Sequence, residues 1–168
     1  MARRVYLDSN IIISAFSGEG ERENAVLLLD LIGAVPPTTT DAPFVTSELT
    51  LAETLVRPLR IGLDEMIRTM DTVLTSSAWL SVVPIDRQIM FGAAWARSLH
   101  RSVKLPDAIH IATAIASRCS DLLTADTGLA GEYDLRDWQR GATHRPGPVR
   151  VIRPDVSTLQ ELIAWLSA

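Results

Sequence analysis

The sequence predicts an α/β fold built on a short-stranded parallel sheet, and three observations lead to this prediction. Short β-branched and apolar runs alternate along the chain with longer segments whose apolar residues recur at helical spacing. Such alternation is typical of βαβ units. The 168 residues are 47% hydrophobic and 21% charged, without a low-complexity or single-sign block, which favours one compact domain over residues 1–168.

Five segments are predicted strands: residues 4–7, 44–46, 79–85, 121–124 and 149–152. Each is short, rich in Val, Ile, Leu or aromatic residues, and bounded by polar or turn-forming residues. Continuous apolar runs of this length indicate strands that are buried on both faces of a sheet.

Helices are predicted between these strands from apolar spacing and from residues that begin or end helices. Asp86 and Asp155 are N-cap residues, Pro106 stands in a first turn, Gly33 follows a last turn, and Pro58 is expected to break a helix. The predicted helices are residues 11–16, 21–32, 48–56, 63–74, 87–100 and 105–116, and one that follows Asp155 with an apolar stripe expected to be core, a homodimer contact being the alternative.

Two segments are predicted connections. Residues 35–43 hold three prolines and three threonines, and residues 134–148 are polar, arginine-rich and turn-rich around Trp138. Arg136, Trp138 and Arg140 are candidate RNA contacts, because an aromatic ring with nearby guanidinium groups can stack on and hold single-stranded RNA. The alternative is that Trp138 attaches a long surface loop to the core.

Composition excludes several classes of function. A net charge of −4 and a pI near 5.3 argue against non-specific nucleic-acid binding driven by bulk charge. The lone Cys119 cannot form an internal disulfide. No apolar stretch is long enough to span a membrane, and Met-Ala-Arg-Arg leads directly into a strand, so we expect a cytoplasmic protein without membrane contact.

Four acidic residues stand where strands end or helices begin. Asp8 and Asp126 follow predicted strands, Asp107 is in a helical first turn, and Glu53 lies within a helix. Because ligands of parallel sheets bind outside the carboxyl ends of the strands, these carboxylates are expected to share one crevice. Ionised carboxylates in one crevice repel, and a hard divalent cation relieves the repulsion.

Each acid also has a purely structural interpretation. Asp8 can form an Asx turn with Asn10, Asp107 can interact with a helix dipole, and Asp126 can begin a turn at residues 127–128. Glu53 can complete a capping box with Thr50.

Two neighbouring groups are weighed against these acids. Glu48 is expected to be a solvent-exposed helix-start residue. His110 lies three residues after Asp107 and invites a general-base role, but a histidine in so apolar a helix is expected to be a satisfied core or rim residue.

The chemistry of an all-carboxylate site favours Mg²⁺ or Mn²⁺ over Zn²⁺. Such ions activate water and stabilise the charge that develops on a phosphoryl group. The residues alone therefore predict a hydrolase acting on phosphodiester bonds.

Four ordered motifs resemble the PIN-domain ribonucleases, most closely the VapC-type toxins of toxin–antitoxin systems. They are Asp8-Ser9-Asn10, the helix TSELTLAETLVRP that contains Glu53, the helix LPDAIHIATA that contains Asp107, and the strand end LTAD that contains Asp126. The resemblance covers residues 4 to about 131, and the final loop, strand and helix of residues 132–168 lie beyond it.

The resemblance implies a three-layer α/β/α PIN-like domain and a Mg²⁺- or Mn²⁺-dependent endoribonuclease. Asp8 and Asp107 would be the principal metal ligands, Glu53 and Asp126 would complete the catalytic site, and Asn10 and Thr124 would support it. A small protein antitoxin is the implied partner. The alternatives are a non-catalytic RNA-binding or scaffold PIN-like protein, and a haloacid-dehalogenase-type phosphatase, against which Asn10 counts because that chemistry expects a second aspartate there.

Overall fold

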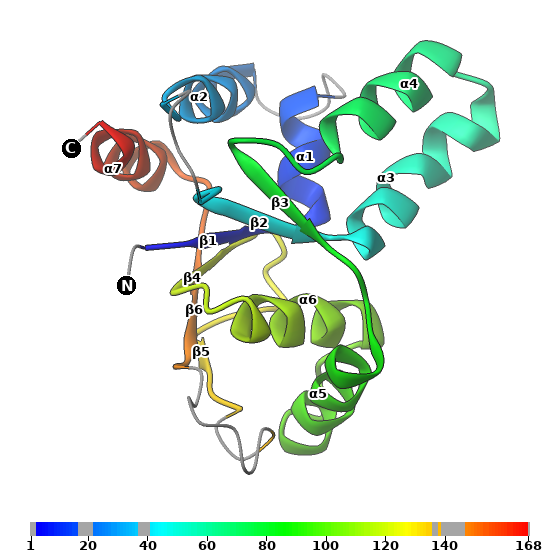
Figure 1. Cartoon of the computed structure of the whole chain (residues 1–168), viewed down its shortest axis with the longest axis vertical. Helices are drawn as coiled ribbons and strands as arrows, with labels where there is room; N and C mark the ends of the chain where they lie inside the picture. The colour runs from blue at the N-terminus through cyan, green and yellow to red at the C-terminus, as the bar shows by residue number, and fades with distance from the viewer. Residues whose placement is uncertain (1–2, 17–21, 37–40, 136–137, 139–146, 168) are drawn as a thin grey trace.

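The computed structural model describes residues 3–16, 22–36, 41–135, 138 and 147–167, and these form three α/β/α layers around one sheet (Figure 1). The strands of the described residues are β1 (Val5–Leu7), β2 (Phe44–Ser47), β3 (Leu80–Val83), β4 (Asp121–Leu123), β5 (Glu132–Tyr133) and β6 (Val149–Ile152). The helices are α1 (Ser9–Phe16), α2 (Arg22–Gly33), α3 (Glu48–Ile61), α4 (Asp64–Val73), α5 (Arg87–Leu99), α6 (Leu105–Ala116) and α7 (Val156–Leu166). The predicted fold class is confirmed.

The sheet has the order β3-β2-β1-β4-β6-β5. All neighbouring pairs are parallel except β5 with β6, which is antiparallel. The predicted parallel sheet is confirmed for the other pairs, and the antiparallel edge was not predicted because β5 contains only two residues and gave no strand pattern in the sequence. From β1 the chain runs to β2 on one side, whereas β4 lies on the other, so the strand order reverses between β1 and β4.

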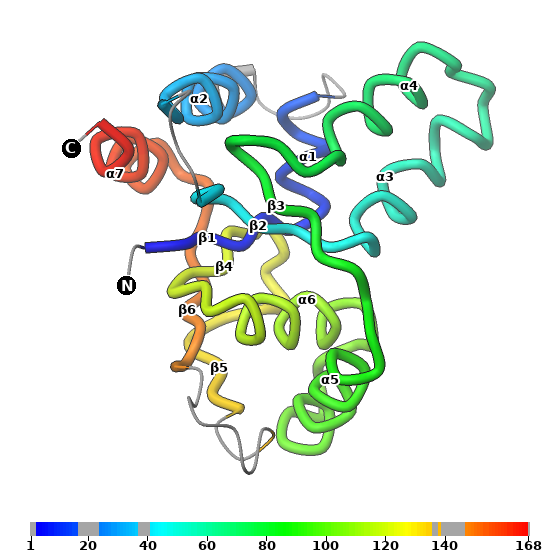
Figure 2. Tube along the Cα trace, viewed as in Figure 1, coloured from blue at the N-terminus to red at the C-terminus, as the bar shows by residue number. Residues whose placement is uncertain are grey.

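Two apolar cores cover the faces of the sheet. Helices α5 and α6 pack on one face, and α1, α2 and α7 cover the other, while α3 and α4 extend beyond the end of β2 (Figures 1 and 2). Strand β1 contributes side chains to both cores. Val5 and Leu7 face α1 and α2, whereas Tyr6 faces α6. This alternation follows from the two-residue period of a strand, and it points the Tyr6 side chain toward α6.

Helix α3 corrects the prediction that Pro58 ends a helix. The helix continues through Pro58 to Ile61 and ends at Gly62, whose φ of 69° is left-handed. Proline removes one backbone hydrogen bond, worth about 1 kcal/mol. The buried ring of Pro58 packs near Met66 and Met70 of α4, so apolar burial offsets that loss.

The C-terminal helix belongs to the core. Leu159 and Leu162 of α7 are fully buried, and α7 packs against α2. The core interpretation of its apolar stripe is therefore confirmed. Among the described helices, none is long and apolar enough to cross a membrane.

Candidate metal centre

The candidate site lies where the strand order reverses, at the carboxyl ends of β1 and β4. Asp8 directly follows β1, and Thr124 and Asp126 follow β4. The Asp8 backbone N–H donates to the Leu123 carbonyl at 3.1 Å and so holds the two strand ends together. Open α/β sheets bind ligands at such a reversal point.

Asp8 is held by donors from both strand ends. The residue is 5% exposed, its Oδ1 accepts the Ser9 backbone N–H at 2.7 Å, and its Oδ2 accepts Asn10 Nδ2 at 2.7 Å and Thr124 Oγ1 at 2.5 Å. Asn10 Oδ1 accepts the Ala125 N–H at 2.9 Å, which connects the β1 and β4 loops again. A local Asx turn with Asn10 does not by itself account for the position of Asp8, because Thr124, which follows the neighbouring strand, also donates to the carboxylate.

Glu53 meets His110 across the crevice. His110 Nε2 lies 2.9 Å from Glu53 Oε2 and 3.5 Å from Asp8 Oδ1. Burial tends to raise the pKa of Glu53, but the hydrogen bond and charge of His110, with a hydrogen bond from Ser9, lower that pKa below its usual range. The capping-box alternative was wrong, since Thr50 bonds instead to Thr46 Oγ1 at 2.7 Å.

Behind His110 lies a buried chain of hydroxyl groups. His110 Nδ1 is 2.8 Å from Tyr6 Oη, and Tyr6 Oη donates to Ser47 Oγ at 2.9 Å. His110 is 2% exposed, and Tyr6 and Ser47 are fully buried. Ser47 stands at the N-cap position of α3, but its hydroxyl makes no capping bond and instead accepts from Tyr6 Oη.

Asp107 and Asp126 form the outer part of the site. Burial, then the charge of Asp126, and then that of Asp8 raise the pKa of Asp107. Asp126 is exposed, and its Oδ1 accepts the Gly128 N–H at 2.8 Å, so the turn expected as its structural alternative is present. The Asp126 N–H donates to Thr124 Oγ1 at 2.9 Å, which ties this turn to Asp8.

The donor set fits a divalent cation. Asp8, Glu53 and His110 each offer a ligand atom, and these atoms lie within 4.8 Å of one another. Burial is the main reason that the pKa of Asp107 is raised, and the charges of Asp126 and Asp8 add a repulsion that a cation would relieve. A hard divalent ion coordinated by oxygen, with room for one nitrogen ligand, matches these groups.

The structure brings the predicted site residues to one end of the sheet. Those residues are Asp8, Asn10, Glu53, Asp107, Thr124 and Asp126. Sequence reasoning gave no site role to Ser9, Tyr6, Ser47 or His110. The signals for Tyr6 and His110 were a tyrosine in a fully buried strand and a histidine in an apolar helix, since both must find buried polar partners. Glu48 is exposed, as expected.

Trp138 packs onto the protein. A Cβ placed on Gly92 of α5 would lie 2.6 Å from the Trp138 ring, and Trp138 contacts the core on the α5 and α6 face. Its predicted packing against the core is therefore confirmed, and its contact with RNA stays a prediction. Arg136 and Arg140 lie outside the described residues.

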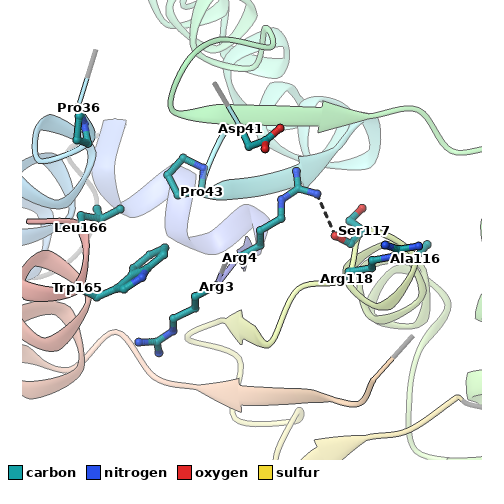
Figure 3. Close-up of a pocket in the computed structure, with 10 residues that line it drawn as sticks. All are labelled: Arg3, Arg4, Pro36, Asp41, Pro43, Ala116, Ser117, Arg118, Trp165 and Leu166. Carbon is teal, nitrogen blue, oxygen red and sulfur yellow. Dashed lines mark hydrogen bonds between the residues drawn. The ribbon is translucent and has the colours of Figure 1, made fainter. Parts of the chain in front are cut away.

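An open cavity of about 650 Å³ lies away from the acidic site (Figure 3). Figure 3 shows Arg3 and Arg4 between Trp165 and the end of α6. Arg3 binds Asp121 and Glu161, and Arg4 donates to the carbonyls of Ala42 and Ser117. These contacts of the two arginines join the β1 end of the sheet to α6 and α7. We therefore assign the arginines that line the cavity a structural role.

The chain belongs to the PIN-domain family, whose model matches residues 5–131. No curated protein sequence matches the chain. Among solved structures it is similar to a toxin–antitoxin complex from Klebsiella pneumoniae, with 28% identity, a TM-score of 0.54, and coverage of 73% of this chain and 87% of that one.

Two further structures share the fold at lower identity. VapC20 of Mycobacterium tuberculosis, described as a sarcin–ricin loop cleaving toxin, has 15% identity, a TM-score of 0.59, and coverage of 73% of this chain and 90% of that one. FitAB bound to an IR36 DNA fragment has 17% identity, a TM-score of 0.54, and coverage of 89% and 94%.

Proposed function

We propose that this protein is a divalent-metal-dependent endoribonuclease that acts in the cytoplasm as the toxin of a toxin–antitoxin pair. One observation carries the proposal: acidic side chains from β1, α3, α6 and the β4 loop converge at the strand-order reversal of a PIN fold. Membership of this family removes the haloacid-dehalogenase alternative. The non-catalytic scaffold alternative remains an outcome of the tests below.

Asp8, Glu53 and Asp107 would hold Mg²⁺ or Mn²⁺, with Asp126 at the outer edge. A bound ion of this kind activates water and stabilises charge on the phosphate. Asn10 and Thr124 orient Asp8, because both donate to the same carboxylate oxygen. Asp126 is exposed and Asp107 is half-buried, so a single strand would approach the ion from their side of the crevice.

The substrate and partner are supported by the comparisons. One similar structure is described as a sarcin–ricin loop cleaving toxin, and the one at 28% identity is a toxin–antitoxin complex. A small apolar cavity of about 100 Å³ borders Glu53 and is lined by Ile13, Met66 and Met70. We propose that an antitoxin segment covers this cavity and places a basic side chain among the carboxylates.

The nuclease assignment is tested with Asp107→Asn and, as a matched control, Glu48→Gln. Total cellular RNA is incubated with each purified protein in Mg²⁺, in Mn²⁺ and in chelator, and new 5′ ends are mapped. We expect cleavage by the wild-type and Glu48→Gln proteins that chelator stops, and a loss of at least about 100-fold for Asp107→Asn. Cleavage by Asp107→Asn at the wild-type rate contradicts the site, and no metal uptake by calorimetry supports the scaffold alternative.

The toxin assignment is tested by expression of the chain alone and together with its neighbouring open reading frame. We expect a growth defect in the first case, relief in the second, and co-purification of a small protein. Normal growth with no co-purifying partner contradicts the toxin assignment and leaves the nuclease assignment to the biochemical test.

A further inference from the structure

His110 occupies the centre of the carboxylate group. It comes from α6, one turn after Asp107, and its almost fully buried side chain contacts Tyr6 of β1 and Glu53 of α3. Its Nε2 is 2.9 Å from Glu53 Oε2 and 3.5 Å from Asp8 Oδ1. Both neighbours are the same carboxylates that the proposed function assigns to the metal.

These separations match the spacing of ligands around one ion. Two ligand atoms at right angles, each about 2.1 Å from an octahedral cation, stand about 3.0 Å apart. The three pairs among Asp8, Glu53 and His110 all lie within 4.8 Å, so one ion can reach all three with small side-chain adjustments.

The other ring nitrogen is placed as in a metal-bound histidine. Such a histidine donates its second N–H to a fixed partner, which sets the tautomer and directs the lone pair at the metal. Tyr6 Oη lies 2.8 Å from His110 Nδ1 and donates its own hydrogen to Ser47 Oγ. A lone pair of Oη can therefore accept the Nδ1 hydrogen.

We propose that His110 Nε2 is a direct ligand of the divalent ion, together with Asp8 and Glu53, and that Tyr6 and Ser47 hold the required tautomer. Without metal, Nε2 carries a hydrogen that faces the acceptor oxygen of Glu53. In the metal-bound form the Nε2 hydrogen is lost to solvent, Nδ1 keeps the hydrogen that Tyr6 Oη accepts, and the bound ring is neutral. The inference rests on the proposed metal dependence and names a ligand beyond the carboxylates.

A nitrogen ligand changes which metal the site prefers. Mg²⁺ takes oxygen ligands almost exclusively, whereas Mn²⁺ and later transition metals bind imidazole more readily. The site should therefore favour Mn²⁺ over Mg²⁺ more strongly than an all-carboxylate site. His110→Gln removes this preference because glutamine offers an amide of similar reach without the imidazole lone pair.

The direct test is pulsed electron paramagnetic resonance of the Mn²⁺-loaded wild-type protein. We expect a ¹⁴N coupling of a coordinated imidazole that changes to the ¹⁵N pattern when histidine is ¹⁵N-labelled. The coupling should persist in His100→Gln and His144→Gln and disappear in His110→Gln. Because the first measurement uses the wild-type protein, it decides whether a histidine coordinates the ion even where His110→Gln fails to fold, and the His100→Gln and His144→Gln proteins then exclude the other two histidines.

Calorimetry supplies the second readout. We expect Mn²⁺ affinity to fall about 100-fold in His110→Gln and about 10-fold in Tyr6→Phe, with a smaller loss for Mg²⁺. Mn²⁺ binding without nitrogen coupling, or an unchanged Mn²⁺ to Mg²⁺ ratio in His110→Gln, overturns the ligand assignment while the ribonuclease stands. Nitrogen coupling in a protein that cuts no RNA upholds the ligand and overturns the proposed function.

Discussion

Thr124 connects the two strand ends that form the site, and its replacement by valine tests that connection. The fully buried Oγ1 donates to Asp8 Oδ2 at 2.5 Å and accepts from Asn10 Nδ2 at 3.0 Å and from the Asp126 N–H at 2.9 Å. Valine has nearly the same shape, so Thr124→Val removes the hydrogen bonds and leaves no cavity.

The expected loss of stability in Thr124→Val follows from these hydrogen bonds. The hydrogen bond from Thr124 to the charged Asp8 carboxylate contributes about 2 kcal/mol. The substitution also leaves Asn10 Nδ2 and the Asp126 N–H without this acceptor, which costs only about 1 kcal/mol more because water can reach the exposed Asp126. We expect the free energy of unfolding to fall by about 3 kcal/mol. With a urea m-value of about 2 kcal/mol/M, the midpoint should fall by about 1.5 M.

Thr113→Val is the matched control. Thr113 is also fully buried, but its hydroxyl donates only to the Ile109 carbonyl one helical turn earlier, at 2.8 Å. That carbonyl keeps its backbone hydrogen bond, so the expected loss is below about 1 kcal/mol. Urea unfolding is followed by circular dichroism in chelator, and Thr124→Ser, which retains the hydroxyl, should recover most of the loss. A Thr124→Val midpoint no lower than that of Thr113→Val refutes the reasoning.

Three further predictions concern stability and reactivity. Gly62→Ala should lower stability by about 1 kcal/mol in urea unfolding, because Gly62 ends α3 at a φ of 69°; an unchanged midpoint would show that the turn relaxes. Burial raises the pKa of Cys119 to about 12, so a thiol reagent at pH 8 should react only after unfolding, and rapid labelling of the folded protein contradicts its burial. Burial tends to raise the pKa of Asp121, but Arg150, Ser120 and Arg3 lower that pKa below its unfolded value. The ionised Asp121 carboxylate should therefore stabilise the folded protein above about pH 4, and this contribution should be lost as the pH falls further. The stability difference between wild type and Asp121→Asn should therefore shrink from pH 5 to pH 3, and a constant difference is the contrary result.

Local sequence signals found most of the architecture. Short apolar runs predicted β1, β2, β4 and β6 to within a residue or two, because a strand buried on both faces leaves a continuous apolar signature. The two misjudged places lacked such signals. Pro58 stops a helix by local rules but is overruled by packing against α4, and β5 pairs two residues that have no pattern of their own.

The sequence by itself determined which acidic side chains can meet. Asp8 and Asp126 follow adjacent parallel strands, and α/β topology alone brings those strand ends together. Only the tertiary structure decided what lies between them. His110 is an apolar-helix residue in the sequence, and its contacts with Glu53, Asp8 and Tyr6 join residues as far as 104 positions apart. Chain spacing carries no information about such contacts, because they depend on how α6 and α3 pack against β1.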